Sequence, residues 1–253
     1  MNRETIKLIA VITMLINHIG YLFFQPPVKD VLMAIGYFAC ITMCWFLVEG
    51  YHYTRSKKSY ASRLLLFALI SQIPFALVAS LGKTAAVHEL NVIFNLFFCF
   101  LIIHVQETVV NPDRRRICTV LLMAACLFCD WDIMAPVFVL FFVWAGRDRE
   151  KQVKAWIRSV FLWGIIYYLS KMAELTEYAD KAGMKPGTGF FPDVPLNFLL
   201  PMTGPALAAV CILCFYNGKT TQHYKGFFKW FFYLFYPIHL LILGLLKMWG
   251  CGL

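Results

Sequence analysis

Residues 6–24 have the sequence IKLIAVITMLINHIGYLFF, in which Lys7 is the only formally charged side chain. A bilayer core of about 30 Å needs roughly 20 mainly apolar residues to cross it as an α-helix. Because the stretch has this length and composition, it predicts a membrane-spanning helix. The Gln25-Pro26-Pro27 that follows offers no small-residue cleavage site. We therefore interpret the segment as a retained helix and not as a signal peptide.

The whole chain of 253 residues has the same character. It is 60% hydrophobic and only 15% charged, it contains 24 Phe, and its mean hydropathy is +0.68. Soluble domains are about 45–50% apolar and about 25% charged, so this composition excludes an ordinary globular enzyme, a disordered chain and a nucleic-acid-binding domain. The apolar runs are too long for the strands of a membrane barrel. We therefore predict an all-α, polytopic bundle in the membrane.

Nine apolar runs account for the predicted spans. They are residues 6–24, 31–50, 64–81, 91–106, 117–129, 133–145, 157–172, 196–216 and 229–249. The two short runs 117–129 and 133–145 flank Asp130-Trp131-Asp132, and we interpret them as two spans joined by an acidic turn, with one broken helix as the alternative. The count is about nine, with a range of eight to ten. Glycines and prolines make residues 173–195 a loop, so residues 1–253 form a single domain.

The distribution of Lys and Arg gives the orientation. With the N-terminus in the cytoplasm, nine spans place the segments 1–7, 51–63, 107–116, 146–158 and 217–229 inside. These segments hold 17 of the 23 Lys and Arg residues, and the outer side holds six. The positive-inside rule predicts this bias. It supports an odd number of spans and a cytoplasmic N-terminus, and it makes the net charge of +9 mostly a matter of topology.

Two histidines lie within the predicted hydrocarbon core, where ionisable groups are costly and usually functional. His18 follows Lys7 by eleven residues, about 16 Å or three turns along the first helix, so both project from nearly the same face. His239 lies about ten residues from the cytoplasmic Lys229, behind Pro237, which can kink the last helix. A buried histidine can simply bond a neighbouring helix. Two at matched depth, from the two ends of the chain, favour a shared polar site.

Other polar side chains give weaker signals. Glu49 lies at the end of the predicted second helix, and a purely structural role for it would be an ion pair with Arg55 or Arg63. Gln72 lies next to Pro74, where a kink and polar groups suit a cavity lining, which Asn91 and Asn95 are also placed to face. Asp130 and Asp132 we expect to be solvated turn residues. The nine cysteines lie mostly in apolar helices without charged neighbours, so we expect neither a disulfide framework nor a metal site.

Four blocks of this sequence resemble the TraX family. They are 7–20, with Asn17-His18-Ile19-Gly20; 46–55, FLVEGYHYTR; 63–75, RLLLFALISQIPF; and 231–241, FFYLFYPIHLL. In this family, Asp commonly stands where this chain has Asn17. The resemblance implies N-acetylation of pilin at its amino terminus. It also implies a likeness to the transmembrane acyltransferase superfamily, in which a basic residue precedes a catalytic His by the spacing of Lys7 and His18.

What the resemblance implies is a tunnel that admits acyl-CoA from the cytoplasm and holds its thioester at mid-membrane. Acyl transfer needs a base, and His is suited to that near neutral pH. It also needs hydrogen-bond donors for the developing oxyanion and cations for the phosphates of coenzyme A. We expect the catalytic residues to be His18, His239, Asn17 and Tyr236, and the residues that bind acetyl-CoA to be Lys7, Arg55, Arg63, Glu49 and Gln72.

The predicted function is therefore that of an acetyl-CoA-dependent acyltransferase in the bacterial cytoplasmic membrane. Its partners would be a coenzyme A thioester, membrane lipid and an acceptor that the sequence leaves open: a peptide such as pilin, or a glycan. No metal and no nucleic acid are expected. A proton-coupled transporter or flippase that uses the histidine pair is the first alternative. A membrane scaffold in which the histidines only bond neighbouring helices is the second.

Overall fold

The computed structural model describes residues 1–82, 89–181, 194–221 and 224–250. These residues form nine α-helices and one π-helical segment, and they contain no named strand. The helices are α1 (Arg3–Phe23), α2 (Val28–Tyr53), α3 (Lys57–Leu81), α4 (Val92–Thr108), α5 (Pro112–Cys126), α6 (Met134–Ala145), α7 (Arg149–Lys181), α8 (Val194–Val210), which continues as η2 (Cys211–Phe215), and α9 (Lys225–Met248). The predicted all-α membrane bundle is confirmed.

Helix lengths refine the predicted spans. Among the described residues, five helical stretches are long and apolar enough to cross a membrane: α1, α2, α3, residues 198–215 and residues 226–248. The run from 117 to 145 forms two helices, as predicted, and not one broken helix. At 1.5 Å per residue, the 15 residues of α5 and the 12 of α6 extend only about 22 and 18 Å. Each is therefore shorter than the hydrocarbon core.

Helix α7 is the main departure from the predicted lengths. It continues through 33 residues to Lys181, whereas the apolar run ends at 172. Polar residues such as Lys171 and Glu174 are compatible with a helix, and these two form an ion pair one turn apart. Hydropathy marks only the part of a helix that is apolar, so it ends the predicted span early. Residues 182–193 of the predicted loop lie outside the described residues.

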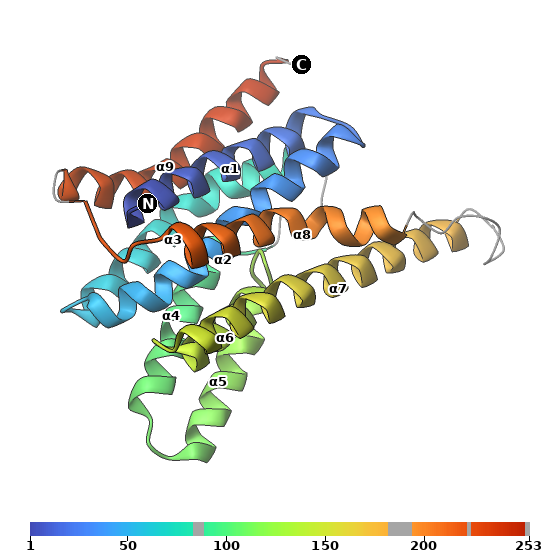
Figure 1. The fold of residues 1–253 in the computed structure, drawn as a ribbon. Helices are drawn as coiled ribbons and strands as arrows, with labels where there is room; N and C mark the ends of the chain where they lie inside the picture. The colour runs from blue at the N-terminus through green and yellow to red at the C-terminus, as the bar shows by residue number, and fades with distance from the viewer. Residues whose placement is uncertain (83–88, 182–193, 222–223, 251–253) are drawn as a thin grey trace.

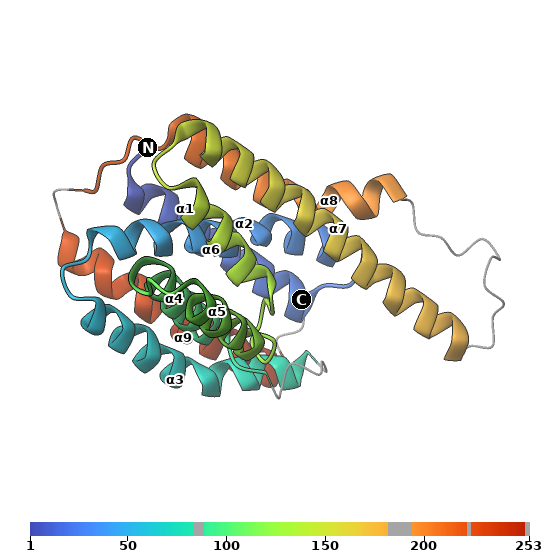
Figure 2. The same ribbon diagram turned by 90° about the horizontal axis from the view of Figure 1, so that it is seen from below.

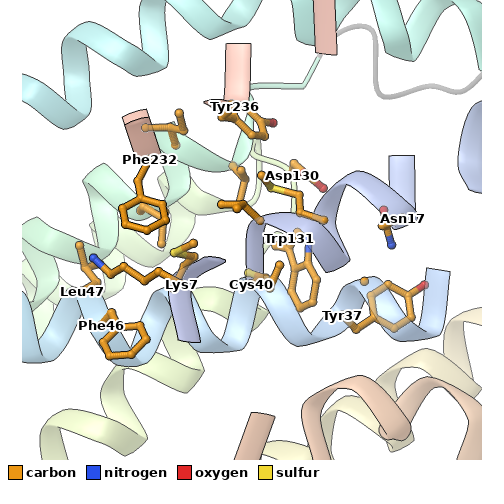
Figure 3. A pocket seen from close by; sticks show the side chains of 18 of the residues that line it. Lys7, Asn17, Tyr37, Cys40, Phe46, Leu47, Asp130, Trp131, Phe232 and Tyr236 are labelled. Carbon is orange, nitrogen blue, oxygen red and sulfur yellow. The ribbon is translucent and has the colours of Figure 1, made fainter. Parts of the chain in front are cut away.

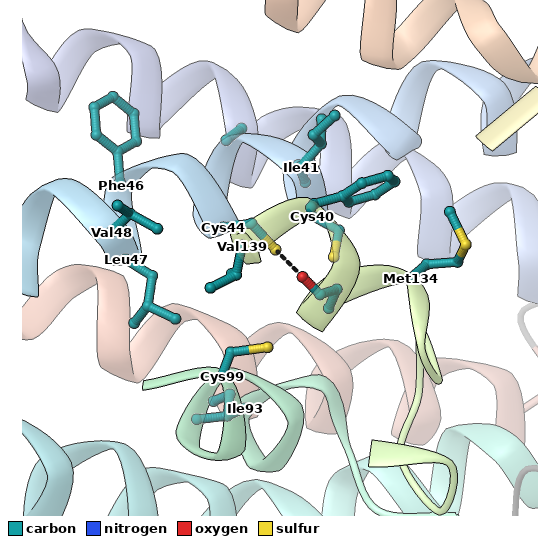
Figure 4. Packing of buried hydrophobic residues seen from close by; sticks show 14 of the residues in the cluster. Cys40, Ile41, Cys44, Phe46, Leu47, Val48, Ile93, Cys99, Met134 and Val139 are labelled. Atoms are coloured by element: carbon teal, nitrogen blue, oxygen red, sulfur yellow. Dashed lines mark hydrogen bonds between the residues drawn. The ribbon is translucent and has the colours of Figure 1, made fainter. Parts of the chain in front are cut away.

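Helix α2 is the centre of the bundle. It packs against α1, α8, α6 and α4, and Figures 1 and 2 show it between them. Its mid-section, including Ile41, Cys44 and Phe46, is buried. Figure 4 shows this apolar cluster, in which the Cys44 thiol donates to the Ala135 carbonyl over 3.8 Å. Close packing and hydrogen bonds of this kind hold helices together inside the membrane, where the hydrophobic effect between helices is weak.

Small residues let neighbouring helices approach α2 closely. A Cβ on Gly36 would overlap the side chain of Asn17 on α1, and a Cβ on Gly204 would overlap the α2 backbone at Ala34 and Phe38. This is the packing mode expected between membrane helices. The contact at Gly36 draws α1 against α2, while α9 packs against both α1 and α3. The first and last helices of the chain therefore lie side by side (Figure 1).

Candidate functional site

A cavity of about 900 Å³ runs through the bundle. Side chains of α1, α2, α3, α4, α6, α7 and α9 line it, together with the turn between α5 and α6. Its lining along α2 extends from Met33 to Thr54, and these 21 helical steps correspond to about 30 Å. The cavity therefore extends over a distance close to the thickness of a bilayer core. Its volume is in the range of ligand-binding pockets.

The end of the cavity that is predicted to face the cytoplasm is cationic. Arg3, Lys7, Arg63 and Lys229 line it, with Glu4 as the acidic member. The Lys7 ammonium lies 5.4 Å from the centre of the Phe46 ring and 5.5 Å from that of Phe232, between the two rings in Figure 3. None of the described carboxylates lies within ion-pair distance of it. The two cation–π contacts with Phe46 and Phe232 are therefore the interactions that stabilise the Lys7 ammonium.

Glu49 has a different partner from those expected. Its carboxylate accepts from Arg3 Nε over 2.9 Å and from the Tyr216 hydroxyl over 2.7 Å, and it forms an ion pair with the Arg3 guanidinium. The predicted pairing with Arg55 or Arg63 is therefore wrong. The hydrogen bonds join the start of α1, the end of α2 and the residue after the π-helical segment. Glu49 does not line the cavity, but it holds Arg3, which does.

The structure brings His18 and His239 together. Their ring centres are 5.0 Å apart, and His239 Nε2 lies 3.3 Å from His18 Nδ1. His18 Nδ1 also lies 2.8 Å from the Met14 carbonyl, and His239 Nδ1 lies 2.7 Å from the Phe235 carbonyl. A carbonyl oxygen only accepts, so in the neutral pair each Nδ1 carries the proton. His239 Nε2 then accepts from His18, and His18 Nε2 keeps its lone pair.

The two histidines face different hollows. His18 lines the central cavity, whereas His239 lines a second, apolar hollow of about 720 Å³ between α9 and Leu15. His239 is 6% exposed. The pair therefore forms part of the wall between these two spaces. His18 is the member that a molecule in the central cavity can reach.

Asn17 and Tyr236 also line the central cavity (Figure 3). One N–H of the Asn17 amide donates to the Met33 carbonyl over 3.0 Å, which leaves the amide's second N–H and its oxygen. The Tyr236 ring centre lies 6.4 Å from that of His18. The Tyr236 side chain is 4% exposed; its oxygen faces the Val92 backbone N–H, and its O–H has no acceptor among the described residues. It is therefore a buried polar group that a ligand in the cavity can satisfy.

Besides Glu49, two more of the residues expected to bind acetyl-CoA do not line the cavity. Arg55 is exposed in the link between α2 and α3. The Gln72 amide donates to the Glu89 carbonyl over 2.8 Å and accepts from the backbone and side-chain N–H groups of Asn91. The Gln72 side chain therefore secures the start of α4. The apolar residues around Gln72 indicated that it lies within the bundle, but they could not indicate that its partners are Glu89 and Asn91.

Asn95 also has a structural partner. Its amide nitrogen donates to the carbonyls of Asp130 and Asp132, each over 2.9 Å. Together with backbone hydrogen bonds between Leu90 and residues 128 and 130, it fastens the turn between α5 and α6 to the start of α4. The expectation that Asn91 and Asn95 face the cavity is not met, because neither belongs to its lining.

Asp130 was missed as a site residue. We expected a solvated turn, but Asp130 lines the cavity, and burial, with a smaller contribution from Glu89, raises the pKa of its carboxyl to about 7. The following Trp131 has φ of 68°, a left-handed conformation that is rare for a bulky residue. Such strain occurs at functional sites. The one feature of the sequence that could have indicated this site was the acidic pair, Asp130 and Asp132, between two apolar runs.

The cysteines show no redox or metal arrangement among the described residues. Eight are described, and all are free thiols. No group of three or more His, Cys, Asp or Glu side chains within the described ranges is arranged to hold a metal ion. The polar groups that line the described part of the cavity include imidazole, hydroxyl, amide, carboxylate, thiol and basic side chains.

Comparison with known proteins agrees with this architecture. A curated relative, the "Probable fimbrial assembly protein FimC, serogroup H1" of Dichelobacter nodosus, is 28% identical over 251 residues, which cover 96% of this chain and 94% of the relative. No solved structure matches the chain. The model of the family described as "TraX protein" matches residues 2–247. Because that match covers nearly the whole sequence, this chain belongs to the TraX family.

Proposed function

We propose that the protein is an integral membrane acyltransferase of the bacterial cytoplasmic membrane. It transfers an acetyl group from cytoplasmic acetyl-CoA to an amine or hydroxyl of an acceptor at or beyond mid-membrane. The observation that carries the proposal is His18, a base with a defined tautomer, in a cavity whose predicted cytoplasmic end is cationic. The family and the fimbrial name of the relative favour a peptide amino terminus as the acceptor.

The cationic end supports binding of the coenzyme A phosphates. Arg3 and Lys7 of α1 and Arg63 of α3 line the same end of the cavity. A cation at membrane depth without a counterion is costly, and an anionic ligand would remove that cost at Lys7. Guanidinium groups can contact phosphate oxygens in pairs, whereas Lys acts as a point charge. The Glu49 carboxylate fixes Arg3 from behind through their ion pair.

His18 is suited to act as the general base. Its Nε2 lone pair takes the proton of the acceptor N–H or O–H as the acceptor atom attacks the thioester carbonyl carbon. The C–S bond then breaks, and the thiolate leaves and takes up that proton as the free thiol. His239 accepts from His18 Nδ1–H over 3.3 Å. It thereby holds the tautomer that leaves Nε2 basic, so we assign it a positioning role.

Two donors are available for the developing oxyanion. The Tyr236 O–H has no acceptor among the described residues, and the Asn17 amide has an N–H beyond the one given to Met33. Both side chains line the cavity with His18. A buried donor that is unpaired in the resting state can gain its hydrogen bond as charge develops on oxygen, which is the requirement for transition-state stabilisation.

Acetyl-CoA binding to the detergent-purified protein tests the proposal. Titration calorimetry should show saturable binding that Lys7→Ala weakens at least tenfold and His18→Ala leaves within about twofold, because His18 acts on the reaction and not on the phosphates. Lys154→Ala is the matched control, since Lys154 is exposed on α7 and pairs with Glu150. Absence of binding at millimolar acetyl-CoA would overturn the proposal.

Turnover separates the two histidines. With Gly-Phe-Gly amide as acceptor, release of free thiol should fall by about 10²–10⁴-fold in His18→Ala, the usual contribution of a general base. His239→Phe keeps an aromatic ring and removes the accepting nitrogen. It should lower kcat more mildly and move the pH–rate profile, because the His18 Nδ1 proton then keeps only the Met14 carbonyl as its acceptor. A variant with reduced yield but an unchanged profile would show a merely structural role for His239.

Transport is the alternative that the cavity itself keeps open. A hollow that extends about 30 Å along α2 suits a solute path as well as a tunnel, and a histidine pair can relay protons. Proteoliposomes distinguish the two functions. Proton uptake driven by a solute gradient, without thiol release from acetyl-CoA, would favour the transporter.

A further inference from the structure

Aromatic side chains form the walls of the cavity at the end predicted to face outward. Tyr37, Trp131, Trp163 and Tyr167 all line it. The two indoles are stacked with centres 4.6 Å apart, and the Tyr37 ring meets them edge-on at 5.8 and 4.8 Å. The rings of an interfacial aromatic belt face the lipid headgroups. These four rings instead face a cavity.

A carboxylate without a visible counterion lies beside these rings. Asp130 lines the cavity next to Tyr37 and Trp131 (Figure 3). No basic side chain among the described residues forms an ion pair with it. The charged groups that act on it are Glu89 and Asp132, both acidic. A partly buried carboxylate with acidic neighbours is costly to ionise unless a cation joins it.

A third observation points to a missing ligand. The Tyr236 side chain is 4% exposed, and although its oxygen faces the Val92 backbone N–H, its O–H has no acceptor among the described residues. Tyr236 interacts electrostatically with Asp130 and has its ring 6.4 Å from that of His18. It therefore links the outer end of the cavity to the proposed base. A group bound between Asp130 and Tyr236 would lie on the way to His18.

We propose that Asp130, within the cage of Tyr37, Trp131 and Trp163, binds the protonated amine of the acceptor and determines that an amine is preferred to a hydroxyl. This rests on the proposed function and adds a specificity-determining residue to it. A carboxylate supplies the counterion, and the faces of Trp and Tyr attract a cation within about 6 Å. The cavity then has opposite charge preferences at its two ends, anion inside and cation outside.

The proton balance is consistent with a site of this kind. An ammonium group is not nucleophilic, so it must lose one proton before attack, and the Asp130 carboxylate can accept it. The neutral amine then attacks the thioester carbon, His18 Nε2 takes the second proton, and the C–S bond breaks. The thiolate receives the proton from His18. One amide, one free thiol and one proton, released from Asp130, are the products of one ammonium and one thioester.

A matched pair of probes tests this site without any acetyl transfer. Gly-Phe-Gly amide carries an ammonium group, and glycolyl-Phe-Gly amide carries a hydroxyl in its place. Binding to the purified full-length protein can be measured by calorimetry at pH 8. We expect the amine to bind at least tenfold more tightly than the hydroxyl analogue. In Asp130→Asn, this preference should fall to less than threefold, while Asp113→Asn, which removes an exposed surface carboxylate, should keep it.

The aromatic cage has a separate test. Trp131→Leu should weaken amine binding several-fold more than it weakens binding of the hydroxyl analogue, and Trp131→Phe should restore part of the preference. Equal binding of the two probes by the wild type would overturn the inference, even if Asp130→Asn failed to fold. If acetyl-CoA binds but the amine preference is absent, only this inference fails. If the preference is present without acetyl-CoA binding, the acyltransferase proposal fails and the amine site stands.

Discussion

The His18–His239 pair shows how a buried polar residue is made tolerable within a helical membrane protein. An imidazole has two nitrogens, and each needs a partner or a ligand when it leaves water. The carbonyls of Met14 and Phe235, one turn earlier on each helix, satisfy the two Nδ1–H groups. His239 Nε2 shares the His18 Nδ1–H with the Met14 carbonyl, at 3.3 Å against 2.8 Å. The pair therefore leaves a single basic nitrogen, on the side of the central cavity.

Asp130 makes the stability of the protein depend on pH. Burial raises the pKa of its carboxyl from 3.8 to about 7, so between these values the folded protein retains a proton that the unfolded chain loses. Stability from this group is fully present below about pH 4 and is lost as pH rises through 7. We therefore predict that Asp130→Asn, which cannot ionise, gains thermal stability relative to wild type between pH 5 and pH 8.

The measurement is the difference in Tm between Asp130→Asn and wild type, in detergent, across that pH range. Other groups titrate in both proteins and cancel in the difference. Glu89 and Asp132 are the acidic neighbours of Asp130, so Asp113→Asn is the better control because its carboxylate is exposed and remote in sequence. A difference that stays constant from pH 5 to pH 8 would contradict the raised pKa.

At the scale of elements, helix α2 depends on glycines that let its neighbours approach. Gly204 on α8 has the α2 backbone at Ala34 and Phe38 where a Cβ would stand, and backbone cannot rotate away as a side chain can. We predict that Gly204→Ala destabilises the protein by about 1–3 kcal/mol, the usual cost of overpacking a well-packed core. Thermal unfolding in detergent, followed by the fluorescence of the buried tryptophans, measures it.

Gly226 provides the matched control for this prediction. It is also a helical glycine, but nothing lies within 4 Å of a Cβ built on it. Gly226→Ala should therefore leave stability unchanged or raise it slightly, since Ala favours the helix by about 1 kcal/mol. If both substitutions change Tm equally, helix propensity and not the contact with α2 would explain the effect of Gly204→Ala.

Which features were predictable follows from the range of the forces involved. Hydropathy is local, so it predicted the helices, and residue counting predicted that His18 and His239 lie at similar depth. The partner of Glu49 is Arg3, 46 residues away, and only the packing of α1 on α2 selects it over Arg55. Asp130 was missed because a polar turn between apolar runs looks solvated, while its burial depends on the distant residues Leu90 and Asn95.

For the whole molecule, the charges along the cavity agree with the orientation predicted from the loops. The end with Arg3, Lys7 and Arg63 is also the end where the positive-inside rule places the N-terminus. The opposite end carries Asp130 and Asp132. The basic side chains that line this end are among those that the loop count places inside, so the cavity gathers at one end charges that are already assigned to the cytoplasm. Under the proposed function, the end proposed to bind the phosphates then faces the compartment that would supply acetyl-CoA.

The number of crossings is the last quantity to test, because only five helical stretches reach the length and hydropathy of a full span. If only those five cross, residues 109–111 lie outside. Residues 109–111 are cytoplasmic if α4 to α7 also cross the membrane, or if they enter it only part of the way from the cytoplasmic side. Arg114, Arg115 and Arg116 lie beside them, and the positive-inside rule places these in the cytoplasm. We therefore predict that green fluorescent protein inserted after Val110, which is 92% exposed, is fluorescent.

A reporter fused after α9 is the control for that insertion. Both counts are odd, so both place this end outside, where alkaline phosphatase is active and green fluorescent protein is dark. The control therefore reports correct insertion in the membrane but does not distinguish the two counts. A dark reporter after Val110, together with active phosphatase after α9, would reduce the spans to five. It would place Arg114–Arg116 on the outer side, against the charge bias from which the orientation was inferred.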